Sequence, residues 1–224
     1  MTLYLKAGLV ALMVLGACDD ITKSGVKAPS TTAATTAATT AIAAPEKVRV
    51  SGKDVVIAGP HGFCIDPTET KDSANSAFVL LGSCAAISNT SHRPNPDIPA
   101  ILMATVSRKS ESAPIASSMV SLARFFKSEA GRAALSRDGK AKTVEVIETL
   151  DRNGVFYIHA RDSSTGTLAG AGDEYWRALF NVKGRIVSVS VVWLEDQPIS
   201  TAEGFETLGE FANRIKRENA VAVR

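Results

Sequence analysis

Strand-like apolar segments recur along the chain from residue 46 onward. In the last of them, Val187, Val189 and Val191 alternate with serine, a period of two that predicts one core face and one more polar face. Asn153-Gly154 and Lys183-Gly184 each lie between two such segments, which predicts β-hairpins. The predicted strands are a hairpin over 48–57, then 63–65, 78–87 as one continuous buried strand, 101–106, 143–150, 155–160, 175–182 and 186–194.

Two segments carry a helical pattern instead. Pro114 favours a helix start, and apolar residues follow at helical spacing, with a further helical turn over 129–135. Near the C-terminus, Ser200 and Glu203 have the spacing of a capping box, and the helix that follows carries acids early and bases late. The apolar positions of the two helices are Ile115, Met119, Leu122 and Phe126, then Phe205, Leu208, Ala212 and Ile215.

The order of these elements predicts an α+β fold. Strands, one helix, two further hairpins and a final helix favour a layered α/β sandwich with a mostly antiparallel sheet and two main helices. Residues 46–224 form a single globular domain by length. Trp176 and Trp193 are predicted to anchor paired strands in the core. The element order is similar to the PsbP-like sandwich, a resemblance that implies a topology and no functional residue.

The N-terminus has the layout of an export signal. Lys6 is followed by a ten-residue apolar run, which is far shorter than the ~20 residues of a membrane-spanning helix. Leu15-Gly16-Ala17-Cys18 resembles the lipobox of bacterial lipoproteins. The resemblance implies that 1–17 is a signal peptide and that Cys18 is acylated at the new N-terminus. It also implies a membrane anchor facing the periplasm, and Asp19 slightly favours the inner membrane over the outer.

Residues 18–45 are predicted to be the lipidated N-terminus and a flexible tether. The stretch 31–44 is almost wholly threonine and alanine, so it has little apolar bulk to offset its ordering entropy. A recognition segment or an O-modified stalk is the alternative reading of this stretch.

Two cysteines remain in the domain, Cys64 and Cys84. An even pair in an exported domain predicts a disulfide, which would close a loop of about twenty residues. Two other readings stay open. His61 and His92 could join the cysteines in a metal site, although the spacing matches no common zinc pattern. Alternatively, Cys64 could be a nucleophile paired with His61 or His159.

Composition and motifs limit the possible functions. The net charge is only +2 and no predicted element carries a Lys/Arg cluster, so nucleic acid is not an expected partner. The glycine-rich stretch 165–172 is followed by a strand, whereas a phosphate-binding loop precedes a helix. No motif for a hydrolase, metal or cofactor occurs.

The sequence therefore favours a non-catalytic binding or assembly module, anchored by lipid in the bacterial cell envelope, with an envelope protein as its partner. One alternative is an envelope hydrolase with a cleft near Asp173, Glu174 and His159, because two carboxylates can act as acid and base. Another is a carrier of a small apolar ligand, which needs a cavity between the sheet and the helices.

Overall fold

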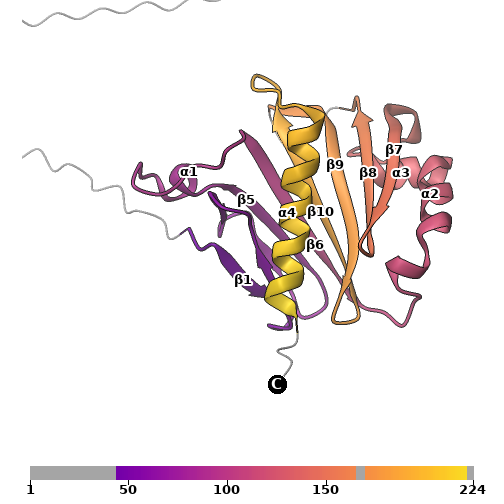
Figure 1. The fold of residues 1–224 in the computed structure, drawn as a ribbon, viewed down its shortest axis with the longest axis horizontal. Coiled ribbons are helices and arrows are strands. Elements are labelled where there is room, and N and C mark those ends of the chain that lie inside the picture. The colour runs from indigo at the N-terminus through magenta and orange to yellow at the C-terminus, as the bar shows by residue number, and fades with distance from the viewer. Residues whose placement is uncertain (1–43, 165–169, 221–224) are drawn as a thin grey trace, which may run out of the picture. The chain divides into compact units, whose positions relative to one another are not determined.

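The computed structural model describes residues 44–164 and 170–220, which form an α+β sandwich around one large antiparallel sheet (Figure 1). The signal peptide, Cys18 and the tether up to residue 43 lie outside the described residues. The large sheet has eight strands in the order β3-β5-β6-β10-β9-β8-β7, and β4 pairs with β5. Its strands are β3 (Phe63–Ile65), β4 (Lys71–Asp72), β5 (Ala77–Ser83), β6 (Ala100–Lys109), β7 (Val144–Arg152), β8 (Val155–Asp162), β9 (Ala171–Val182) and β10 (Arg185–Leu194).

The two long hairpins confirm the turn prediction. Asn153 and Gly154 both have positive φ between β7 and β8, and so do Lys183 and Gly184 between β9 and β10. Two consecutive residues of positive φ match the right-handed twist of the strands that they join. The predicted hairpin near the N-terminus also forms, but β1 (Lys47–Val50) and β2 (Val55–Ala58) make a separate two-stranded sheet.

The long helix α4 (Thr201–Asn219) crosses one face of the large sheet over β9 and β10 (Figure 1). Ser200 and Glu203 form the predicted capping box, which satisfies backbone N–H groups at the start of the helix. Large side chains fill the space between helix and sheet, where the carrier alternative required a cavity. The largest of them are Trp176, Phe180, Leu208, Phe211 and Ile215, all buried.

Shorter helices cover part of the opposite face. The 3₁₀ helix η1 (Ile115–Ser117) lies against β8 and β9, while α2 (Met119–Lys127) and α3 (Glu129–Leu135) pack on the edge strand β7. A side chain at Gly131 would collide with the backbone of Phe125, so this glycine permits the sharp elbow between α2 and α3. Ser128 caps α3 by accepting a hydrogen bond from the N–H of Gly131.

The predicted strand over 78–87 is only partly correct. β5 ends at Ser83, whose hydroxyl accepts a hydrogen bond from the N–H of Ala86 and caps a short helix, α1 (Cys84–Ser88). A local serine cap therefore overrides the continuous apolar run. Burial along β5 also alternates, because only one of its faces is covered by other elements.

The last strand differs from its predicted pattern too. Val187, Val189 and Val191 are buried as expected, but Ser190 and Val192 on the opposite face are also buried. Val192 packs in the second core cluster, which extends beneath η1 and α2. The preceding strand begins at Ala171, inside the predicted loop 165–172, of which 165–169 lie outside the described residues.

Two buried polar side chains join the small sheet to the rest of the domain. Arg185 donates hydrogen bonds to carbonyl groups of Ser51 and Ser107, among others. On β2, one residue past the turn that contains Ser51, the side chain of Asn219 at the end of α4 pairs with both backbone groups of Val56, at 2.9 and 2.7 Å. The backbone of the small sheet is therefore tied to the rest of the domain at Ser51 and at Val56.

Residues just before β1 also pack against the domain. Ala44 is buried against the two cysteines, and its carbonyl accepts a hydrogen bond from Arg93. The carbonyl of Pro45 accepts one from the N–H of Ile65. Within residues 44–164 and 170–220, no helix is both long and apolar enough to cross a membrane.

Candidate functional site

Cys64 and Cys84 are joined in a disulfide, the pairing that their number and context predict. Cys64 lies on β3 and Cys84 begins α1, and their Cα atoms are 4.7 Å apart. Both side chains are buried together with Ala44. The bond therefore lies where the chain enters the domain, and it leaves neither sulfur as a thiolate for nucleophilic chemistry.

The structure does not assemble the proposed metal site. His61 is exposed beside α4, where it lines a small hollow with Glu210 and Arg214. His92 is exposed in the loop after α1. Across the ranges that the structure describes, no group of three or more His, Cys, Asp or Glu side chains is placed to hold a metal ion.

The structure separates Asp173 from the other two residues of the hydrolase alternative, Glu174 and His159. Asp173 and Glu174 are adjacent on β9, so their side chains project from opposite faces of the sheet. Asp173 is exposed, while Glu174 points to the face that carries His159 and α4. These two carboxylates therefore do not converge as an acid and base pair.

His159 and Glu174 do form a compact cluster. Nε2 of His159 donates to Oε1 of Glu174 at 2.8 Å, and the imidazole stacks on the indole of Trp176 with ring centroids 4.4 Å apart. Arg161 donates to the other carboxylate oxygen at 2.7 Å. Burial opposes ionisation of Glu174, but the hydrogen bonds from Arg161 and His159 outweigh it and lower the pKa of that carboxyl. The cluster holds Glu174 ionised and both partners oriented.

A Glu174→Gln variant is expected to lose about 1.5 kcal/mol of stability at pH 7, because a charge-assisted pair becomes a neutral one. The pKa of Glu174 is lower in the folded protein than in the unfolded chain. Ionised Glu174 therefore stabilises the fold fully above its unfolded-state pKa, and this stabilisation is lost as the pH falls through its folded-state pKa. Urea denaturation at pH 7 and pH 3 should show a smaller loss at pH 3. Glu145→Gln is the control, because Glu145 is an exposed partner of Arg161. Equal losses for Glu174→Gln at both pH values would contradict this assignment.

The sheet face opposite α4 is only partly covered, because η1, α2 and α3 pack at the β7 side. The strands β5, β6, β9 and β10 present side chains there in rows set by their register, and all of these side chains except Ser190 are half-buried or exposed. We call this surface the open face. It consists of Phe78, Leu80, Ile101, Met103, Thr105, Arg177, Ser188 and Ser190.

Arg177 is the charged residue of the open face. Its Nε donates to the hydroxyl of Ser190 at 3.0 Å, and its guanidinium lies 5.2 Å from the ring centre of Tyr175. The hydroxyl of Tyr175 in turn donates to the carbonyl of Leu135 on α3. Arg177 takes part in none of the ion pairs found among the described residues. A fixed guanidinium with free N–H groups is suited to bind a carboxylate from outside.

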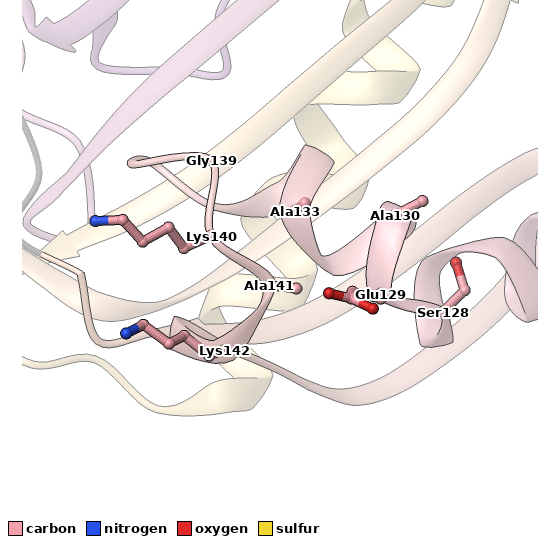
Figure 2. A pocket seen from close by; sticks show the side chains of 8 residues that line it. All are labelled: Ser128, Glu129, Ala130, Ala133, Gly139, Lys140, Ala141 and Lys142. Carbon is pink, nitrogen blue, oxygen red and sulfur yellow. The ribbon is translucent and has the colours of Figure 1, made fainter.

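A hollow of about 780 Å³ lies between α3 and residues 139–142, a loop that leads into the 3₁₀ helix η2 (Ala141–Thr143) (Figure 2). Its floor consists of small side chains, and Lys140 and Lys142 extend to the same side of the loop, away from Glu129 (Figure 2). Lys140 pairs with Asp138 at 2.9 Å, and hydrogen bonds from Ser136 and Lys140 hold the pKa of Asp138 well below its usual range. Lys142 is exposed, so the rim of this hollow is basic.

These features define an α+β sandwich domain with one partly uncovered sheet face. No family model and no curated protein matches the chain. Among solved structures, the extracellular domain of PknH from Mycobacterium tuberculosis is similar over 67% of this chain and 67% of its own, with 9% identity and a TM-score of 0.32.

Proposed function

We propose that this chain is a binding module of the bacterial cell envelope, anchored by lipid on Cys18 and facing the periplasm. The open face is the observation that carries the proposal. A sheet face with four half-buried apolar side chains is suited to bury a partner, because apolar area removed from water drives association.

Arg177 indicates the chemistry of that partner. Among the eight residues that define the open face it is the charged one, and Ser190 and Tyr175 hold it in place. A partner protein with apolar side chains and one carboxylate complements this arrangement. The carboxylate would pair with Arg177, whereas elsewhere on the open face it would lose its hydration without compensation. The proposed partner is therefore an envelope protein with an acidic residue inside an apolar contact segment.

The test is crosslinking in the native envelope, followed by affinity recovery of the full-length lipidated protein and mass spectrometry. Wild type is expected to recover one stoichiometric partner, and Leu80→Glu is expected to lose it, because this change places a carboxylate on the open face. Ile147→Glu is the matched control, since Ile147 is an exposed apolar residue on the distant edge strand β7.

Two outcomes would overturn the proposal. Equal recovery with Leu80→Glu and wild type would show that the open face is not the contact surface. Fractionation of Cys18→Ser tests the anchor separately: this variant should remain as an unprocessed or soluble precursor. Normal processing and membrane attachment of Cys18→Ser would remove the lipid assignment while leaving the open face untouched.

A further inference from the structure

α2 exposes large apolar side chains to solvent. Val120 is 74% exposed and Phe125 is 42% exposed; with Ile147 they are the large apolar side chains exposed in residues 44–164 and 170–220. Leu122 and Phe126 on the other side of the helix pack into the second core cluster. Val120 and Phe125 do not fill that core, and exposed apolar side chains of this kind indicate a contact with a membrane or with another protein.

Basic residues are also concentrated in this region. Residues 119–143 contain six basic and two acidic residues, a net charge of +4, while the rest of the chain has 19 basic and 21 acidic residues. Arg124 and Lys127 flank Val120 on the outward surface of α2, while Phe125 lies about 140° around the helix, at the border of the packed side. α2 has no acidic residue. The ion pairs among the described residues involve neither Arg124 nor Lys127.

Exposed apolar side chains interspersed with cations are the composition of a helix that lies in the headgroup region of an anionic membrane. We infer that α2 contacts the surface of an anionic phospholipid bilayer, with Val120 entering the boundary between headgroups and acyl chains. Arg124 and Lys127 then pair with lipid phosphates, and the basic rim of Lys142 adds attraction at longer range.

This inference rests on the proposed function in one respect, because the lipid on Cys18 brings the domain to a bilayer. Cys18 precedes Ala44 by 26 residues, a contour of at most roughly 90 Å, so the anchor permits contact without enforcing it. A second, weak contact through α2 would fix the orientation of the domain, because two linked contacts act with a high effective concentration. α4 lies across the sheet from α2, so it remains away from the bilayer in that orientation.

The test uses full-length lipidated protein in vesicles of phosphatidylcholine, with and without phosphatidylglycerol. Val120→Cys introduces the single reactive thiol, since Cys64 and Cys84 are paired and Cys18 is acylated. A nitroxide on that thiol should become accessible to oxygen and protected from a water-soluble nickel complex in the anionic vesicles. Glu210→Cys is the control, because this exposed residue lies on α4, across the sheet from α2, and its label should stay in water.

Charge reversal supplies the second arm. Arg124→Glu in the Val120→Cys background is expected to weaken the surface contact at least about fivefold, the loss expected from one basic side chain near an anionic surface. A label on Val120 that stays in water in anionic vesicles, while the protein remains anchored, would overturn the inference. Dipolar broadening between labels, or immobilisation by another protein, would assign this surface to a second copy or a protein partner and would overturn it equally. A protein that is not anchored at all would contradict the proposed function instead.

Discussion

Replacing Trp176 with alanine is expected to lower the free energy of unfolding by about 4 kcal/mol. The side chain is 1% exposed and lies at the centre of the contact between β9 and α4. It stacks on His159, lies 4.9 Å from the ring centre of Phe205, and donates a hydrogen bond from Nε1 to the carbonyl of Thr201. Truncation would leave a large cavity and remove a hydrogen bond to the first turn of α4.

Urea denaturation followed by far-ultraviolet circular dichroism measures this loss. Trp176→Phe separates the contributions, because phenylalanine keeps an aromatic ring against Phe205 but cannot donate to Thr201. It is expected to lose about 1–2 kcal/mol. Val120→Ala is the control, since Val120 is exposed and should change stability by less than about 0.5 kcal/mol. A loss below about 2 kcal/mol for Trp176→Ala would mean that α4 contributes little through this contact.

Removing the disulfide is expected to cost about 3 kcal/mol. The bond spans a sequence separation of 20 residues, and closing a loop of that length limits the entropy of the unfolded chain by this amount. The double variant Cys64→Ser/Cys84→Ser measures the effect. Its loss should appear as a lower denaturation midpoint in urea, with the sheet still formed under native conditions.

Wild-type protein in a reductant provides an independent comparison. Reduced wild type and the serine variant should have similar stability, because both lack the constraint on the unfolded chain. If the serine variant is much less stable than reduced wild type, the cost arises from burying two hydroxyl groups beside Ala44 and not from the lost crosslink.

The features that the sequence predicted correctly are those encoded within a few residues. Asn153-Gly154 specifies its own turn, and the capping box of Ser200 and Glu203 specifies its own helix start. The short helix α1 was missed because the apolar run over 78–87 concealed the serine cap at Ser83. The sequence indicates α1 only by a serine just before a segment of small residues, and the continuous apolar run is a stronger indication of a strand.

The candidate site depends on contacts between distant segments, which no local pattern reports. Arg177 belongs to the open face because β6, β10 and β9 pair in one register, which the residues around Arg177 do not reveal. Arg185 and Asn219 likewise bridge positions more than 100 residues apart. The basic region of residues 119–143 escaped notice because its charges are spread over three short elements.

The position of the disulfide has a mechanical consequence. If the N-terminus is held at a membrane, any load enters the domain at Ala44 and reaches β1 and β2 first, which are secured by Asn219 and by the pairing of Pro45 with Ile65. Peeling this segment as far as Cys64 releases about 70 Å of chain, at roughly 3.5 Å per residue. The bond to Cys84 then stops the unravelling at the edge of the large sheet. The small sheet can therefore unfold under tension while the open face remains folded.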